Sequence, residues 1–394
     1  MIFRATIDAF VLSPETAAAF ESLKADGAFA MARIAVHPGG LAAAADAYAA
    51  RPTPQLVVVE EADDDATMLA RLDRLAEVCD PGTRVIVIGR LNDIDLFRTL
   101  MARGVGEYLV TPVETPRLAA AIARLFADPD AAPRGKVLAF WGARGGVGAS
   151  TLAQNVAHAL GRRLGEAAIY LDLDLAFGTS LLAFNVDPRQ TAVDLLSQPE
   201  RLDAVLLDRL MVTYDDAVRV LAAPADPHHA ATATLDGVDR LLDLAATMAP
   251  AVVADLPRAW CDWTAHVLAA AHETVVVATP DLAALRETKT MLDAIGPRRA
   301  AGAPARVALN KLDAYRKTQL SPKDFAETLG VDPALALPFE PQLFGEAANT
   351  GQMLAAVARG HKVVEQIGGF AERLVGRAAG RKAPANPLLR LLRR

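Results

Sequence analysis

Short apolar runs rich in β-branched residues alternate with longer helical stretches over the first part of the chain. Five such runs precede residue 113, and each has the length of one strand: residues 7–13, 32–37, 55–61, 84–90 and 106–112. A chain that alternates strands and helices in this way builds a parallel sheet with helices on both faces. The pattern predicts a small doubly wound α/β domain, closed by a helix over residues 116–129.

The second half repeats this plan on a larger scale. Six further apolar runs predict a larger parallel sheet: residues 137–142, 167–175, 218–224, 251–257, 274–280 and 306–311. A late helix is expected over residues 351–367. Between the halves lies a stretch rich in Pro, Asp and Gly, as linkers are. We therefore expect two doubly wound α/β domains and a tail, divided as domain 1–127, linker 128–135, domain 136–376 and tail 377–394.

Composition excludes several classes of protein. Of 394 residues, 52% are hydrophobic and 22% are charged, which are ordinary values for globular domains and argue against long disorder. The two cysteines, Cys79 and Cys261, lack the spacing of a disulfide framework or a zinc site. The sequence contains neither a signal-peptide pattern nor an apolar run of membrane-spanning length. These features favour a cytoplasmic protein.

Charge is distributed unevenly along the sequence. The whole chain has a net charge of −6, but residues 377–394 hold six basic residues and no acid, which leaves −12 for the remainder. Because so acidic a body repels phosphate backbones, we expect no nucleic acid as a partner. Residues 386–394 are rich in Leu and Arg. Two alternatives stay open for this tail: a weak contact with an anionic membrane, or a solubilising extension.

A glycine-rich segment gives the strongest chemical signal. Residues 142–151 read GARGGVGAST and lie between an apolar strand and a long helix. Such a turn directs backbone N–H groups and a helix N-terminus toward an anion, and its small residues leave room for phosphate oxygens. We predict a nucleotide-binding loop with these members: Gly145, Gly146, Val147, Gly148, Ala149, Ser150 and Thr151.

Carboxylates follow two later strands. Asp172 and Asp174 are two residues apart, so they point the same way if the strand runs through both. Asp255 follows an apolar strand in an Asp-x-Pro pattern. Each of these residues, taken alone, is typical of an Asp that caps the next helix. Together with the glycine-rich loop, and in this order, they favour a site for nucleotide chemistry.

The loop resembles the deviant Walker A motif of the MinD/ParA ATPases, KGGxGK[ST]. Arg144 stands where that family has the lysine that reaches the partner's phosphates across a nucleotide-sandwiched dimer. Ala149 stands where it has the P-loop lysine. Arg144 keeps a cation that can act in trans, whereas Ala149 removes the ammonium group that spans the β- and γ-phosphates. We therefore expect weak ATP binding with little or no hydrolysis.

The same resemblance assigns roles to the other polar residues. It makes Asp174, with Arg144, a candidate catalytic residue, because the family's acid at this position orients the attacking water. It implies a Mg²⁺ site at Ser150, Asp172 and Asp255, whose oxygens suit this cation.

The base pocket depends on the segment NKLD at residues 310–313. These four residues match the guanine motif NKxD of GTPases, but in MinD/ParA proteins an Asn at this strand end contacts adenine. The resemblance also implies that the segment around Pro338 lines the base pocket. We favour adenine, and hence ATP with Mg²⁺, with Asn310 and Pro338 as base contacts.

The first half resembles a response-regulator receiver domain, most clearly through residues 84–113. Receiver chemistry needs an acidic pair after the first strand, an Asp after the third, and a Lys before the Pro after the fifth. Here these places hold Leu12-Ser13-Pro14, Glu60-Glu61 and Thr111-Pro112. All three depart from the pattern, which predicts a pseudo-receiver used for docking or dimerisation. The acidic run over residues 60–65 is either a solvated face or a metal site.

Joined in this order, the two halves resemble the TadZ/CpaE pilus-assembly proteins over residues 1 to about 370. Segments beyond the P-loop carry this resemblance: residues 171–178, 252–260, 279–293 and 338–354. It implies a homodimer at the cell pole, peripheral to the inner membrane, that recruits the pilus secretion machinery of Flp (tight-adherence) pili. The alternative is an active MinD/ParA-type ATPase, with Arg144 compensating for Ala149, in pilus assembly or in chromosome or plasmid partitioning.

Overall fold

The computed structural model divides the chain into two compact units, residues 1–131 and 132–394. It describes residues 5–25, 29, 32–63, 65–126, 134–299 and 304–376. The expected linker falls largely, and the basic tail entirely, outside these described residues. Within them, none of the helices is both long and apolar enough to cross a membrane.

The first unit is a five-stranded sheet in which every neighbouring pair is parallel, in the order β2-β1-β3-β4-β5. This is the order of flavodoxin-like doubly wound sheets. All five predicted strands are present: β1 (Thr6–Val11), β2 (Arg33–Pro38), β3 (Leu56–Glu60), β4 (Arg84–Gly89) and β5 (Glu107–Val110).

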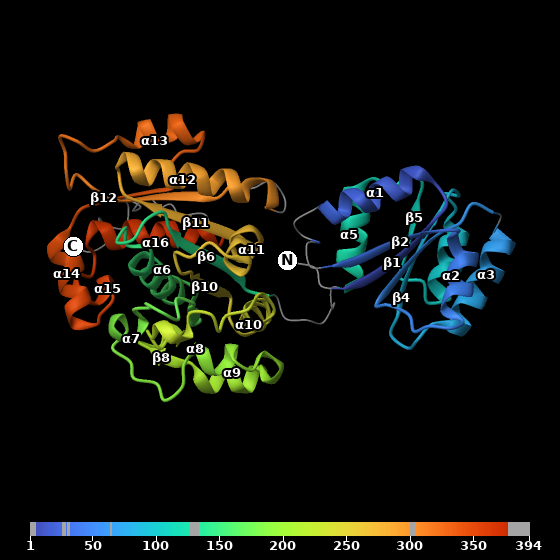
Figure 1. Ribbon diagram of the computed structural model, residues 1–394, viewed down its shortest axis with the longest axis horizontal. Helices are drawn as coiled ribbons and strands as arrows, with labels where there is room; N and C mark the ends of the chain where they lie inside the picture. Colours follow the sequence, from blue (N-terminus) through green and yellow to red (C-terminus); the bar gives the residue numbers. More distant parts are fainter. Residues whose placement is uncertain are drawn as a thin grey trace, which may run out of the picture. The chain divides into compact units, whose positions relative to one another are not determined.

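Helices cover both faces of this sheet (Figure 1). On one face lie α1 (Pro14–Ala25) and α5 (Thr115–Phe126), and on the other lie α2 (Gly40–Tyr48), α3 (Asp65–Val78) and α4 (Ile94–Ala102). The sequence of β3 is continuously apolar because both faces of this strand are buried. Successive side chains of a strand point to opposite faces, so Val58 enters one core while Val57 and Val59 enter the other.

The second unit is an eight-stranded sheet in the order β13-β12-β11-β6-β10-β7-β9-β8, parallel except for β8. Its strands are β6 (Lys136–Gly142), β7 (Ala168–Asp172), β8 (Val212–Tyr214), β9 (Val218–Leu221), β10 (Ala251–Asp255), β11 (Glu273–Ala278), β12 (Arg306–Leu312) and β13 (Leu335–Pro338). The six predicted strands are present. The sequence pattern missed β8 and β13 because runs of three and four residues are too short to show a period.

Strand β6 occupies the point where the strand order reverses, between β10 and β11. Ligands of doubly wound sheets bind beyond the carboxyl ends of strands at such a point. The helices of this unit are α6 (Ala149–Leu164), α7 (Ser180–Ala183), α8 (Ala192–Leu196), α9 (Ala204–Leu210), α10 (Leu235–Met248), α11 (Asp262–Ala270), α12 (Leu282–Ile295), α13 (Pro322–Leu329), α14 (Pro341–Thr350), α15 (Leu354–Val357) and α16 (Lys362–Leu374), with short 3₁₀ turns at η2 (Pro199–Arg201), η3 (Pro227–His229) and η4 (Gly296–Arg298).

One helix prediction in this unit is wrong. The stretch 351–367 is not a single helix, because α15 ends at Val357 and α16 begins only at Lys362. Gly360 between them has a φ of +83°, a left-handed conformation that interrupts a helix. His361 is the N-cap of the new helix, and its side chain accepts a hydrogen bond from the N–H of Val363. The longer helix α16 then packs against α6 on one face of the sheet.

Candidate functional site

The glycine-rich loop joins the end of β6 to the start of α6 at the reversal of strand order. Gly148 is the N-cap of α6, with a φ of +88°, and it offers no side chain to the first turn. Gly146 also has a positive φ, +76°, which glycine adopts without strain. Because the first N–H groups of a helix lack partners within the helix, this uncapped end offers donors to an anion.

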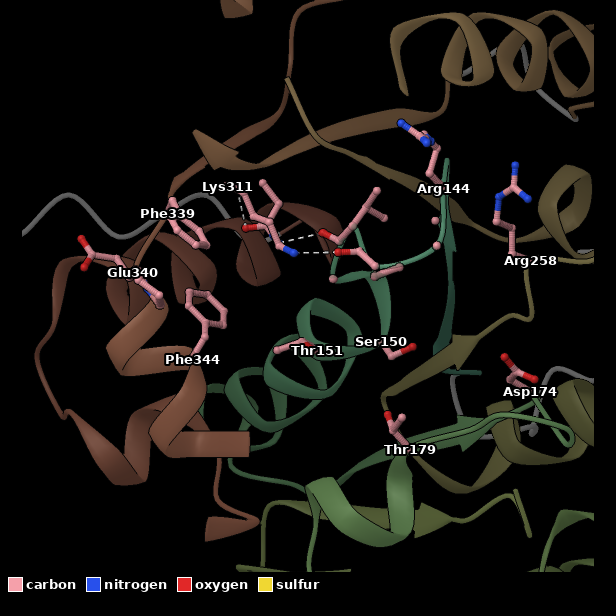
Figure 2. A pocket seen from close by; sticks show the side chains of 18 of the residues that line it. Arg144, Ser150, Thr151, Asp174, Thr179, Arg258, Lys311, Phe339, Glu340 and Phe344 are labelled. Carbon is pink, nitrogen blue, oxygen red and sulfur yellow. Dashed lines mark hydrogen bonds between the residues drawn. The ribbon is translucent and has the colours of Figure 1, made fainter. Parts of the chain in front are cut away.

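The loop lines a cavity of about 450 Å³ (Figure 2). Most of the predicted site residues line it: Arg144, Gly145, Gly146, Val147, Gly148, Ala149, Ser150, Thr151, Asp174, Asn310 and Pro338. Two predicted residues, Asp172 and Asp255, do not, because they are buried behind the loop. Other lining residues were not predicted from the sequence: Thr179, Arg258, Lys311, Phe339 and Phe344.

Strand β12 is tied to the loop by two side chains. The Asn310 amide Nδ2 donates to the carbonyl of Val147 at 2.8 Å, and the Lys311 ammonium Nζ donates to the carbonyl of Gly146 at 2.7 Å (Figure 2). A Cβ atom on Gly148 would stand 2.5 Å from Asn310 Nδ2. Asn310 therefore requires glycine at 148, and its amide holds the loop in shape.

Aromatic side chains form the wall of the cavity beyond this contact. Phe339 follows the last residue of β13, Pro338, and Phe344 lies one turn into α14. Figure 2 shows both rings on the Lys311 side of the loop, opposite Asp174. A flat apolar base fits such a wall, so the cavity has one end suited to a base and another that is polar.

Two buried carboxyl groups lie behind the polar end. Asp172 and Asp255 are register partners on β7 and β10, and they are 0% and 2% exposed. Burial raises the pKa of Asp172 to about 6. Burial, followed by the charge of Asp172, raises the pKa of Asp255 to about 8, although the neighbouring hydroxyl groups of Tyr170 and Ser150 act in the opposite direction.

The surroundings of Asp255 fit a bound cation. Its Oδ2 accepts a hydrogen bond of 2.7 Å from the Tyr170 hydroxyl, but its buried Oδ1 has no hydrogen-bond partner among the described residues. Ser150 lies beside the same carboxyl group and lines the cavity. A hydroxyl and an unsatisfied carboxylate are the oxygen ligands that Mg²⁺ takes beside water and phosphate.

The strand ends before the second residue of the other acidic pair. The sequence made a common direction of Asp172 and Asp174 depend on a strand through both, and β7 ends at Asp172. Asp172 accepts hydrogen bonds from the N–H groups of Asp174 and Ser180, at 3.2 and 3.1 Å. Asp174 lines the cavity, and its Oδ1 accepts a hydrogen bond from the N–H of Phe177 at 3.0 Å. Asp172 thus organises the turn that presents Asp174.

Arg144 lies at the rim of the cavity with 49% of its side chain exposed. Its Nη1 is 3.3 Å from Oδ1 of Asp281, the N-cap of α12. Partial burial raises the pKa of Asp281, but hydrogen bonds from Thr279, Ala284 and Arg144 outweigh this and lower it. The guanidinium group is therefore held loosely at the surface, within reach of another molecule.

Carboxylates paired with neighbouring groups lie at the corresponding edge of the first unit. Glu60, at the end of β3, is 5% exposed. Its carboxylate accepts hydrogen bonds from the N–H groups of Leu12 and Ser13 and from the Ser13 hydroxyl, at 2.7, 3.0 and 2.6 Å. Glu61 is paired with Arg71 at 2.8 Å. In the described parts of the chain, no group of three or more His, Cys, Asp or Glu residues is placed to hold a metal ion.

Comparison with known proteins decides the family. No protein-family model and no curated protein matched the chain. The crystal structure of the pilus assembly protein CpaE from Caulobacter crescentus CB15 is 49% identical over the N-terminal 31% of this chain and 100% of that chain, with a TM-score of 0.31. The chain belongs to the CpaE family. The resemblance to TadZ/CpaE proteins is confirmed, and so is the fold class of two doubly wound α/β domains.

Other solved structures cover the second unit of this CpaE family member. A ParA family ATPase from Chlorobium tepidum TLS is 22% identical over 61% of this chain and 98% of that chain, with a TM-score of 0.55. The septum site-determining protein MinD from Pyrococcus horikoshii OT3, in complex with Mg-ADP, is 18% identical over 61% and 96%, with a TM-score of 0.52. At these identities the likeness establishes the MinD/ParA fold of the second unit.

Proposed function

We propose that the chain is a nucleotide-dependent dimeric scaffold for the assembly of Flp (tight-adherence) pili at the cell pole, and that it binds Mg-ATP weakly with little or no hydrolysis. One observation carries the proposal. The uncapped first turn of α6 opens onto a cavity of about 450 Å³, yet the first residue of that helix is Ala149. The site keeps the donors that bind phosphate and lacks the lysine that helps to cleave it.

Several contacts support binding without turnover. Ser150 and the unsatisfied Oδ1 of Asp255 would hold Mg²⁺, which would neutralise phosphate charge when bound. Asp174 lines the same end of the cavity. However, the charge that develops on the transferred phosphoryl group needs a cation placed at the loop, and an alanine side chain provides none. We therefore expect ATP hydrolysis to be slow or absent.

The partners follow from the family and from Arg144. The similar proteins named above include a pilus assembly protein, and this supports a role beside the secretion machinery of the inner membrane. A half-exposed guanidinium at the rim of a phosphate cavity is suited to the phosphates of a second copy. The basic tail, expected to give a weak membrane contact, lies outside the described residues.

Sedimentation velocity tests the dimer. Mg-ATP is expected to shift the wild-type chain from monomer to dimer, and Arg144→Ala should reduce this shift at least tenfold while the monomer still binds ATP. Arg209→Ala is the matched control, because Arg209 is an exposed arginine of α9 that does not line the cavity. Equal loss of dimerisation and of ATP binding in Arg144→Ala would contradict the role in trans.

An active ATPase is the second candidate, because Arg258 and Lys311 also line the cavity and bring further positive charge. Steady-state ATP turnover separates the two. A rate that Asp174→Ala abolishes would replace the scaffold with an enzyme. Salt-dependent DNA binding by the purified chain would favour partitioning instead, against the charge of −12 outside the tail.

A further inference from the structure

Ala149 leaves the phosphate cavity without a cation from its own helix. Of the described residues that line the cavity, three carry a positive charge: Arg144, Arg258 and Lys311. They come from three different elements, the loop itself, the segment after β10 and the end of β12. The contacts of each side chain indicate which part of a nucleotide it can reach.

Two of the three are poorly placed for the terminal phosphate. Arg144 contacts the Asp281 carboxylate at the N-cap of α12, and the proposed function assigns its guanidinium group to the phosphates of a second copy. The Lys311 ammonium is bound to the Gly146 carbonyl, beside Asn310 and on the aromatic side of the cavity (Figure 2). Lys311 therefore lies at the end that suits the base.

Arg258 lies at the opposite, polar end. It follows Asp255 by three residues, and the intervening Leu256 also lines the cavity. The N–H of Leu256 donates to the carbonyl of Phe140 on β6 at 3.1 Å, which fixes the start of this segment against the loop strand. Figure 2 shows the Arg258 side chain on the same side of the loop as Asp174.

The guanidinium group is anchored at the root of the loop. Its Nε donates to the carbonyl of Ala143 at 3.1 Å, and an Nη lies 3.5 Å from the Glu287 carboxylate. The side chain is 48% exposed, so it can change its rotamer without disturbing the core. A guanidinium has five N–H donors in a planar fork, which leaves donors for phosphate oxygens.

We infer that Arg258 replaces the missing P-loop lysine: it supplies from the segment after β10 the cation that binds the terminal phosphate of a nucleoside triphosphate. The inference rests on the proposed function, since it names the group that holds the ligand of that site. Lysine at 149 and arginine at 258 would then be alternatives for one charge, so their effects on affinity are not independent.

Isothermal titration of the full-length chain with Mg-ATP and with Mg-ADP tests this. Arg258→Gln should weaken ATP about tenfold and change ADP less than twofold, because only ATP has the third phosphate; tenfold is the loss expected for about 1.4 kcal/mol. Lys311→Gln, the matched change at the base end, should weaken both nucleotides by the same factor. The thermal unfolding midpoint of each variant checks that it folds.

A double-variant cycle gives the decisive comparison. Ala149→Lys should restore ATP affinity in the Arg258→Gln background by about tenfold and add much less in the wild-type background. ATP affinity within twofold of wild type in Arg258→Gln, or an equal gain from Ala149→Lys in both backgrounds, would overturn the inference and leave the proposed function standing. A wild-type chain that binds no Mg-ATP would overturn both.

Discussion

The two units have similar sheets, but they differ in how the carboxyl groups at the ends of their central strands are hydrogen-bonded. Both are doubly wound parallel sheets, and in both a carboxyl group follows a central strand. In the first unit, three donors from residues 12 and 13 satisfy Glu60. In the second, Asp255 Oδ1 has no hydrogen-bond partner among the described residues, and it lies behind an uncapped helix end. One edge is closed by its own hydrogen bonds, and the other keeps an acceptor available for a ligand.

The pairing of these carboxyl groups determines which edge can bind a ligand. A glutamate is one methylene longer than the aspartate of a working receiver, and here its carboxylate reaches the N–H groups that follow β1. Buried donors and acceptors that satisfy each other add stability and specificity but leave nothing for a substrate. Among the described residues of the second unit, the acceptor Oδ1 of Asp255 instead has no partner, which costs stability and keeps a place for a ligand.

The largest expected effect is the loss of nucleotide affinity when Gly148 in the loop of the second unit is substituted. Gly148→Ala should weaken Mg-ATP binding roughly 100-fold, because the new Cβ would stand 2.5 Å from Asn310 Nδ2 at a φ of +88°. Gly345→Ala in α14 is the control, since its Cβ meets no atom within 4 Å. Titration calorimetry measures both, and an affinity within threefold of wild type in Gly148→Ala would refute the fit between Asn310 and the loop.

A smaller effect is expected on the local stability of the first unit when Glu60 is substituted. Glu60→Ala removes the acceptor of three hydrogen bonds and should raise amide exchange at Leu12 and Ser13 about 30-fold, which corresponds to about 2 kcal/mol of lost local stability. ATP affinity should not change. Glu15→Ala, at an exposed residue of α1, serves as the control. Unchanged exchange at Leu12 and Ser13 would show that Glu60 does not seal this edge.

The smallest expected effect concerns pH. The pKa of Asp255 rises from 3.8 to about 8 on folding, so the native state binds its proton more tightly than the unfolded chain does. The tighter binding of this proton stabilises the folded chain fully below about pH 4, and the stabilisation is lost as pH rises toward 8. Asp255→Asn cannot ionise, so it should stabilise the ligand-free chain by about 1–2 kcal/mol at pH 8 and by little at pH 4.

Urea unfolding at both pH values measures this difference. The control is Asp187→Asn, at an exposed residue with no place in the cavity. An Asp255→Asn variant that is less stable than wild type at pH 8 would mean that the ionised carboxylate is well compensated without a ligand.

The sequence predicted all strands of the first sheet, and all of the second except β8 and β13, because each predicted strand is an apolar run with a strand's length, as in residues 84–90. It also predicted the loop, whose residues are contiguous. It did not predict Arg258 or Lys311 as cavity residues, because the sequence pattern around an exposed basic residue is the same whether its side chain faces solvent or a ligand. Their positions were still signals: Lys311 directly follows Asn310, and Arg258 follows Asp255 on the same sheet edge.

The sequence pattern also did not show that β7 ends before Asp174. A two-residue spacing gives a common direction only inside a strand, and the chain leaves β7 at Asp172. No local pattern marks that end, because the apolar residues Leu173 and Leu175 continue the alternation into the turn, where they are buried. Tertiary packing, rather than the local sequence, decides where this strand stops.

Amide hydrogen exchange of the full-length chain with and without saturating Mg-ATP tests whether a nucleotide binds at the edge of the second unit and not at that of the first, because one experiment measures both edges. We expect Mg-ATP to slow exchange at residues 145–151 of the loop and to leave residues 7–13 and 56–61 of the first unit unchanged. Unaltered exchange in the loop, or protection at the edge formed by Glu60 and Ser13, would contradict the account.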